Sequence, residues 1–558
     1  MERTRRRTAL FALLAIIGLV AAACGSDKSP SSSGSDTTAP SSQKAGGTVL
    51  FAGEQEPTSL NWLTSADNAA WTQYVMNWVW PGVEYSKPDG SIVTNDDLVS
   101  NVELTSKSPQ TVVYTINPKA TWSDGTPITV DDFKFYADAQ SGKDEKYDPA
   151  GTTGYEDIAS ITGTDNGKTV TVVFTKPFAD WKALFDYIFP AHYFKAKGGG
   201  DPVKGWVDGF KVESLGDMSG FVSGGPYTVT EYKKGQSMTL TKNAKYWGTP
   251  GLLDKIVVPW ITDATQQPAA LENKEADVIF PQAQLDLVQQ VKNIPGIKST
   301  VGFGTFWEHM DFNFSNKHLA DLKVRQALVK ALDRGEIVKR LPGQFSDKAQ
   351  VLDNRIYFPG SKNYKAHGKD AGYGTRDVAG AKKLLTDAGY TIGADGIAAK
   401  GADKLSLKLV WRDPNPRRQQ TAQLVQSQLK EAGFDVVLAP QPDFKFLDAG
   451  AFDIALFGWT GGTVLSANTS IYVPGGGQNY SKNTDPVIKD LFDKANVELD
   501  DVKRADLMNQ IDDQLWKDLP TVSLFQVPEF LASRDTVVGP EYNGYQGPGW
   551  NYPKWSLK

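Results

Sequence analysis

The chain has 558 residues, a net charge of −6 at neutral pH and a single cysteine. An acidic composition without basic clusters argues against nucleic-acid binding, and one thiol cannot form an internal disulfide. The length suits two or three domains.

The first 23 residues have the layout of a secretory signal. Arginines at positions 3, 5, 6 and 7 precede an apolar run over residues 9–23, which ends in small residues before Cys24. The run is shorter than the roughly 20 residues of a membrane-spanning helix, so we expect cleavage. The segment resembles a bacterial lipoprotein signal, with Ala21 in place of the usual Leu. The resemblance implies that the thiol of Cys24 carries a diacylglycerol and that Cys24 begins the mature protein. An ordinary signal peptide and the twin-arginine export route are alternatives.

Residues 24–45 are expected to form a disordered tether. They are rich in Ser and Pro and too polar to bury a core. A flexible coil of about 20 residues spans about 25 Å, enough to hold a folded body clear of a membrane. The rest of the chain has no second apolar stretch of membrane-spanning length, so we expect this body to lie outside the membrane.

The sequence pattern of the first half of the folded body, from residue 46 onward, predicts many strands. An aromatic stripe at helical spacing predicts a helix over residues 71–79 that must stop at Trp80, because Pro81 and Gly82 follow. Another helix is predicted over 269–276. Period-two and β-branched patterns predict strands at 46–53, 112–116, 170–174, 227–232, 237–242, 256–260 and 277–280.

Two adjacent acids, Asp131 and Asp132, have a structural explanation. Thr129 is suited to cap a helix that begins at Val130, and acids in the first turn of a helix are favourable. We therefore expect them to stabilise the helix rather than to take part in catalysis.

Strands and helices alternate after Trp307. The strands are expected at 312–314, 405–411, 434–438 and 452–457, and the helices at 324–332, 377–388, 417–432, 486–497 and 504–519. This alternation predicts an α/β domain with helices packed on a sheet. Residues 530–558 are expected to form an irregular tail that packs back over the body.

The residue patterns of enzymes and metal sites are weak in this chain. The four histidines are scattered without ligand spacing, and no Gly-x-Ser-x-Gly motif is present. Ser41 and Lys44 match Ser-x-x-Lys, but they lie in the tether. A glycosidase with a carboxylate pair is left open among 65 acidic residues. We predict no enzyme activity, no catalytic residue, no metal and no cofactor.

Three spaced motifs carry a resemblance to a known family. They are Trp122–Pro127 followed by Asp131–Phe133, Gly225–Tyr227 with Asn243 and Tyr246–Trp247, and Phe312–Asn313 with Val324–Arg334. Together they are similar to the extracellular solute-binding proteins of ABC importers, in the group called family 5, and the resemblance covers nearly all of residues 46–555.

The resemblance implies a class II periplasmic-binding-protein fold with two lobes around a cleft. By similarity, residues 1–23 are the signal and 24–45 the tether. The first lobe comprises 46–300 and 520–558, with a β-rich insertion at about 91–215, and the second lobe comprises 301–519. Ligand residues implied by the family lie near the turn after the first strand, the end of the first helix, the lobe crossing and a Gly-rich loop. They are Ser59, Asn61, Trp80, Trp307, Asn313, Trp459 and Thr460.

The function implied by the family is that of a lipid-anchored, monomeric receptor. It would capture a peptide or small-molecule solute by closure and deliver it to ABC permease subunits on the extracytoplasmic side of the cell membrane. One departure bears on the ligand: peptide binders of this group place an Asp shortly after the Gly-Trp pair, where it binds the amino group of the peptide. Residues 460–469 contain no acid. An oligosaccharide, a glycolipid or another non-peptide ligand, and an accessory role in the cell envelope without transport, are the alternatives.

Overall fold

The computed structural model describes residues 44–558. The predicted signal, Cys24 and the tether as far as residue 43 lie outside this range. The described residues belong to one compact unit. Among the described helices, none is long and apolar enough to cross a membrane.

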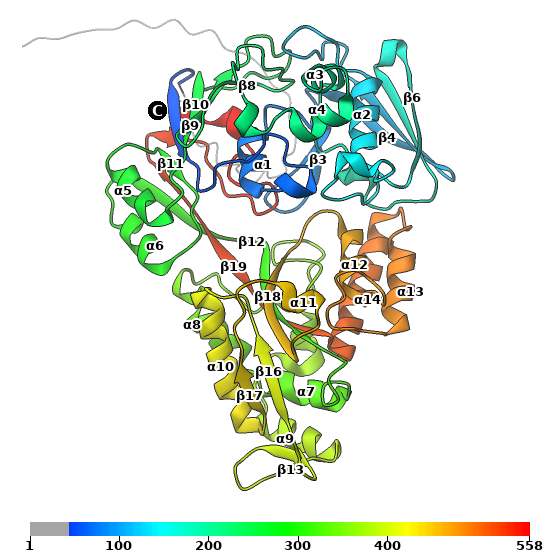
Figure 1. Ribbon diagram of the computed structural model, residues 1–558, viewed down its shortest axis with the longest axis vertical. Helices are drawn as coiled ribbons and strands as arrows, with labels where there is room; N and C mark the ends of the chain where they lie inside the picture. The colour runs from blue at the N-terminus through cyan, green and yellow to red at the C-terminus, as the bar shows by residue number, and fades with distance from the viewer. Residues whose placement is uncertain (1–43) are drawn as a thin grey trace, which may run out of the picture. The chain divides into compact units, whose positions relative to one another are not determined.

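A sheet of ten strands runs through this unit, in the order β17-β16-β18-β12-β19-β11-β1-β10-β9-β8 (Figure 1). At its centre lie two long antiparallel strands, β12 (Ile297–Phe312) and β19 (Thr521–Arg534). On one side β19 pairs with β11 of the first lobe, and on the other β12 pairs with β18 of the second. The two lobes are therefore joined by continuous strands.

We call residues 44–296 with 535–558 the first lobe. Its strands are β1 (Thr48–Ala52), β2 (Glu84–Ser86), β3 (Ile92–Thr94), β4 (Val99–Lys107), β5 (Gln110–Ile116), β6 (Ile158–Thr164), β7 (Thr169–Phe174), β8 (Tyr227–Lys233), β9 (Ser237–Lys242), β10 (Lys255–Pro259), β11 (Val278–Ile279), β20 (Val537–Val538) and β21 (Ser556–Leu557). Its helices are α1 (Ala70–Met76), α2 (Val130–Gln140), α3 (Ala191–Lys197), α4 (Pro202–Asp208), α5 (Gln267–Glu272) and α6 (Leu285–Lys292). Strands β4, β5, β7 and β6 form a separate antiparallel sheet within the predicted insertion.

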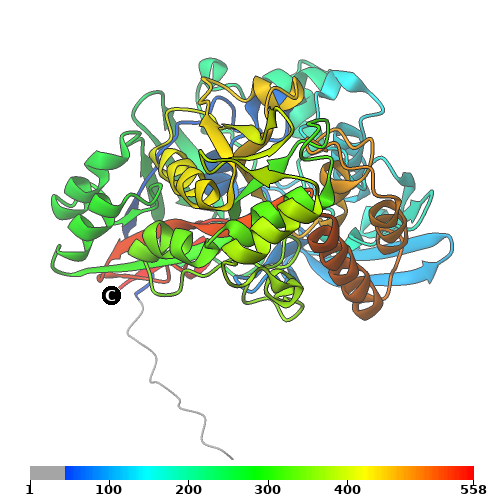
Figure 2. The same cartoon turned by 90° about the horizontal axis from the view of Figure 1, so that it is seen from below.

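We call residues 313–520 the second lobe. Its helices are α7 (Leu322–Ala331), α8 (Arg334–Arg340), α9 (Val378–Asp387), α10 (Pro416–Ala432), α11 (Lys445–Asp448), α12 (Thr469–Tyr472), α13 (Pro486–Ala495) and α14 (Asp501–Asp518), and its strands in the large sheet are β16 (Ser406–Val410), β17 (Asp435–Leu438) and β18 (Ile454–Thr460). Three short strands, β13 (Thr391–Ile392), β14 (Ala398–Lys400) and β15 (Asp403–Lys404), form a small sheet of their own. Figures 1 and 2 show α10 and the α13–α14 pair on opposite sides of the strands. The predicted α/β architecture is thus confirmed.

The capping prediction for α2 is also confirmed. The Thr129 hydroxyl accepts the backbone N–H of Asp131, and the Asp132 carboxylate accepts the N–H of Thr129 at 2.9 Å, which completes a capping box. Asp132 also accepts the N–H of Ala191 at 3.0 Å and the indole N–H of Trp122 at 3.3 Å. The carboxylate therefore ties the helix start to two other segments of the first lobe.

The two central strands were only partly predicted. Residues 530–534, expected to be irregular, belong to β19, and β12 begins at Ile297, long before the predicted strand at 312–314. Nearly every residue of β19 is buried, so its two faces do not differ in polarity. A strand covered on both faces lacks the alternation by which a strand is found in a sequence.

Candidate functional site

A cavity of about 460 Å³ lies between the two lobes. This volume is in the usual range for the binding site of a small ligand. The walls come from both lobes and from six segments: 89–92, 179–182, 356–363, 462–465, 501–505 and Tyr545. Because loops and helix ends form these walls, the cavity depends on how the lobes meet.

Six charged side chains line the cavity, and four of them pair across the lobes. Asp180 of the first lobe lies 2.6 Å from Arg504 of the second, and Lys182 of the first lies 2.7 Å from Asp501 of the second. The other two, Asp89 in the first lobe and Lys362 in the second, form no ion pair with a residue in the range 44–558.

Asp89 is held as an anion by a neighbouring serine. Its carboxylate accepts the backbone N–H of Ser91 at 2.9 Å and the hydroxyl of Ser91 at 2.6 Å, and these hydrogen bonds lower the pKa of Asp89 below its ordinary value. Gly90 between them adopts a positive φ of 79° and packs against the ring of Tyr545, another residue of the cavity wall.

Three of the predicted ligand residues, Ser59, Asn61 and Trp80, are buried in the first lobe. The Ser59 hydroxyl accepts the N–H of Asn61 at 3.1 Å, and the Asn61 amide donates to the carbonyl of Trp206 at 2.8 Å. Trp80 donates to the carbonyl of Val222 at 3.1 Å and stacks with Phe221. Their polar atoms are thus engaged within the fold.

Two more, Trp307 and Asn313, are buried at the second lobe. Trp307 packs with Leu352 and Phe358, and the Asn313 amide donates to the carbonyl of Phe452 at 2.9 Å. Of these residues, only Phe358 also lines the cavity.

The remaining two, Trp459 and Thr460, end strand β18. The Trp459 ring is partly exposed and lies between the rings of Tyr480 and His309, at 6.0 and 5.9 Å. Burial of His309 lowers its pKa to about 3, so this ring is neutral at pH 7. Thr460 is exposed. None of the seven predicted residues lines the cavity, although Gly462, Thr463 and Leu465, shortly after Thr460, do. Their role in ligand binding stays a prediction.

The cavity residues that sequence reasoning missed are Asp89, Asp180, Lys362, Arg504 and Tyr545. Asp89 lies in a Lys-Pro-Asp-Gly turn, the one local signal that pointed to an exposed loop. The others belong to no motif, and only the contact between the lobes brings them together.

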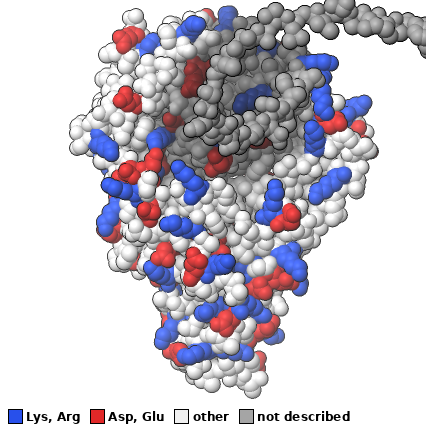
Figure 3. Space-filling model, turned by 180° about the vertical axis from the view of Figure 1, so that it is seen from behind, with Lys and Arg blue, Asp and Glu red and all other residues white. Residues whose placement is uncertain are grey.

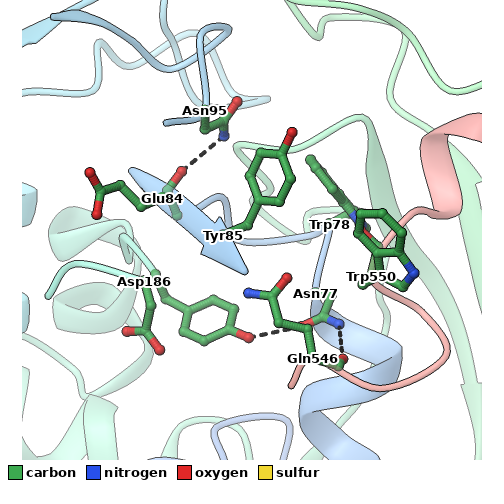
Figure 4. Close-up of a pocket in the computed structure, with 10 residues that line it drawn as sticks. Asn77, Trp78, Glu84, Tyr85, Asn95, Asp186, Gln546 and Trp550 are labelled. Carbon is green, nitrogen blue, oxygen red and sulfur yellow. Dashed lines mark hydrogen bonds between the residues drawn. The ribbon is translucent and has the colours of Figure 1, made fainter. Parts of the chain in front are cut away.

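A second, much smaller cavity of about 20 Å³ lies inside the first lobe (Figure 4). Its volume holds about one water molecule. Tyr187 donates to the side chain of Asn77 at 2.8 Å across it, and Glu84 also lines it. Burial raises the pKa of Glu84 to about 8, so this side chain is protonated at neutral pH. The small cavity is an internal polar pocket rather than a ligand site.

The distribution of charged side chains on one face of the molecule, and the arrangement of the described acidic, histidine and cysteine side chains, bear on a polyanion site and a metal site. On the face in Figure 3, basic and acidic side chains are interspersed instead of gathering into one basic patch. Within residues 44–558, no group of three His, Cys, Asp or Glu side chains is arranged to hold a metal ion.

The chain is similar to known solute-binding proteins. Residues 95–482 match the model of the bacterial extracellular solute-binding proteins, family 5. The oligopeptide-binding protein OppA of Mycobacterium tuberculosis is 30% identical over 509 residues, which cover 89% of this chain and 83% of OppA. An uncharacterised lipoprotein of the same organism is 24% identical, with 85% of this chain and 87% of the relative covered. The structure of the periplasmic EDTA-binding protein EppA superposes with a TM-score of 0.84 at 29% identity, covering 93% of this chain and 97% of EppA. The chain belongs to family 5 of the bacterial extracellular solute-binding proteins, which bind solutes and are not enzymes.

Proposed function

We propose that this protein is the lipid-anchored substrate-binding component of an ABC importer for peptides. The protein acts as a monomer. It captures an oligopeptide or peptide-like solute as the two lobes close, and it delivers the solute to the permease subunits in the membrane.

The observation that carries this proposal is the cavity walled by both lobes. A ligand held there touches its complete set of partners only when the lobes meet, so ligand binding favours closure. The similarity to an oligopeptide-binding protein along most of both chains supports a peptide as the ligand.

The charges of the cavity also suit a peptide with free ends. Asp89 is an anion with no cationic partner, and Lys362 is a cation with no anionic partner among the described residues. A zwitterionic ligand supplies both counter-charges. Asp89 would then bind the amino group for which the loop after Trp459 offers no acid.

The lipid anchor is supported by the N-terminal sequence and by the lipoprotein relative. A receptor held on the outer face of the cell membrane stays close to its permease between captures. The tether expected over residues 24–45 would give it the reach to do so.

A second candidate ligand is a polycarboxylate without an amino group. The likeness to EppA, an EDTA-binding protein, favours it. Such a ligand would bind Lys362 and make no favourable contact with Asp89. Replacing Asp89 should therefore weaken binding of a peptide but not of a polycarboxylate.

Calorimetry on the purified protein, after native mass spectrometry of any co-purified ligand, tests the proposal. We expect a ladder of peptides in the mass spectrum, and weaker binding of the identified peptide after Asp89→Asn or after N-acetylation of the peptide. Asp217→Asn is the matched control, because Asp217 accepts the N–H and hydroxyl of Ser219 at the same 2.9 and 2.6 Å but does not line the cavity. Binding of EDTA but of no peptide would refute the peptide proposal.

A further inference from the structure

One loop of the first lobe reaches the second lobe beside the cavity. This bridging loop, residues 178–182, follows β7 and is fixed in the first lobe by Phe178 and Trp181, which are part of that lobe's hydrophobic core. The backbone N–H of Ala179 donates to the carbonyl of Asn496 in the second lobe at 2.9 Å. The loop therefore bonds the second lobe through its backbone as well as through side chains.

Asp180 makes the central contact of the bridging loop. Its Oδ1 lies 2.6 Å from Nη1 of Arg504 on α14, and its Oδ2 accepts the backbone N–H of Ser466 at 2.8 Å. The Asp180 side chain is only 2% exposed and that of Arg504 only 11%. Both carboxylate oxygens are thus satisfied by the second lobe, and the charges meet away from solvent.

A second ion pair on the same loop is exposed. Lys182 lies 2.7 Å from Asp501, but the two side chains are 41% and 74% exposed. Water and salt screen such a pair, so it contributes little to holding two surfaces together. The bridging loop therefore carries one buried and one exposed pair across the same interface.

Apolar contacts accompany the buried pair. Val464 and Leu499 of the second lobe pack against the core of the first lobe. Val464 lies two residues before Ser466 and Leu499 five residues before Arg504, and of these four residues Arg504 lines the cavity.

We propose that Asp180 and Arg504 form a latch that keeps the lobes in contact when no ligand is bound. When the lobes separate, both groups are hydrated; when they meet, each satisfies the charge of the other. The fraction of protein in the closed arrangement scales the apparent affinity for any ligand that needs both walls. The latch thus sets how tightly the protein binds, whatever the chemistry of the ligand.

Removal of one partner makes the latch unfavourable. In Asp180→Asn, closure would leave Arg504 desolvated beside a neutral amide, whereas the open arrangement is unaffected. The cost of an unpaired buried charge corresponds to a shift of about 100-fold or more towards the open arrangement. Lys182→Gln is the matched control on the same loop, and its solvated pair should produce almost no shift.

Pulsed EPR on the full chain without ligand tests the latch. The single native cysteine is replaced by Cys24→Ala, and spin labels are placed at Lys134→Cys on α2 and Lys382→Cys on α9, which are exposed helical positions in the two lobes. We expect one narrow distance distribution in this reference chain and in Lys182→Gln, and longer, broader distances in Asp180→Asn. Arg504→Gln removes the same pair from the other lobe and should give the same result, while circular dichroism confirms that each variant is folded.

The latch is overturned if folded Asp180→Asn and Arg504→Gln keep the narrow distribution. It is also overturned if the reference chain itself already shows the long distances. Because no ligand is used, either outcome leaves the peptide proposal to be decided by calorimetry.

Discussion

Gly225 offers a direct test of how the fold is held together beside the end of α1. It precedes Pro226 and Tyr227 in one of the motifs that carry the family resemblance. A Cβ atom at this position would lie 2.0 Å from the carbonyl oxygen and 2.6 Å from the carbonyl carbon of Trp78. Both atoms belong to the backbone, so no side-chain rotation relieves the overlap.

We expect Gly225→Ala to destabilise the protein by about 3–5 kcal/mol. Forced overpacking costs about 1–3 kcal/mol, and each hydrogen bond broken by the shift adds about 1 kcal/mol. The bonds at risk are those from Gly225 N–H to the Val79 carbonyl, at 3.1 Å, and from the Asn243 amide to the Gly225 carbonyl, at 2.9 Å.

Gly220→Ala is the control, because it lies in the same loop with nothing within 4 Å of the added Cβ. Urea unfolding followed by tryptophan fluorescence measures both variants. The control should match the wild type or be slightly more stable, since alanine restricts the unfolded chain. If the two variants unfold within about 1 kcal/mol of each other, the steric reasoning is wrong.

Three further predictions concern charge, ligand and anchor. Burial raises the pKa of Glu84 from 4.5 to about 8. Between these pH values the unfolded state releases the proton of Glu84 and the folded state keeps it, so the contribution of the protonated side chain to stability is complete below pH 4.5 and is lost as the pH rises through 8. The unfolding free energy of the wild type relative to Glu84→Gln should therefore fall by up to about 5 kcal/mol across this window in urea titrations, and parallel curves would contradict it. Trp459 does not line the cavity, but its predicted role in ligand binding requires that Trp459→Ala weaken binding of the identified ligand about tenfold in calorimetry; unchanged affinity would refute that role. Cys24→Ala should bind ligand normally but disappear from the membrane fraction; retention there would disprove the anchor.

Elements with a local signal could be predicted from the sequence. The strands predicted at 227–232 and 237–242 match β8 and β9 within one residue, and the helix predicted to end at residue 432 is α10, which is followed by Gly433 with a positive φ of 105°. The side chains of Asp321 and Asp377 cap α7 and α9. In each case the interaction that sets where the helix or strand begins or ends is between residues close in the chain, as in a helix cap or a tight turn.

Elements defined by distant partners could not be predicted. Strands β12 and β19 are covered on both faces by other parts of the chain. The short helices α3, α4, α6 and α8 were not predicted, and helices of seven or eight residues are marginal without tertiary packing. The candidate site is the extreme case. Asp180 and Arg504 are 324 positions apart in the sequence, and nothing in either neighbourhood indicates the other.

The family motifs and the proposed ligand contacts therefore lie on different parts of the molecule. Gly225 and Asp132, both members of those motifs, make backbone and capping contacts inside the first lobe. Asp89 and Lys362 lie on loops at the cavity, where a substitution would alter the proposed ligand contacts and leave the scaffold in place. This separation explains how one chain can be about equally similar to an oligopeptide-binding protein, at 30% identity, and to an EDTA-binding protein, at 29%. Sequence identity over the whole chain measures mainly the shared scaffold. The ligand therefore has to be identified by testing the few charged side chains that line the cavity.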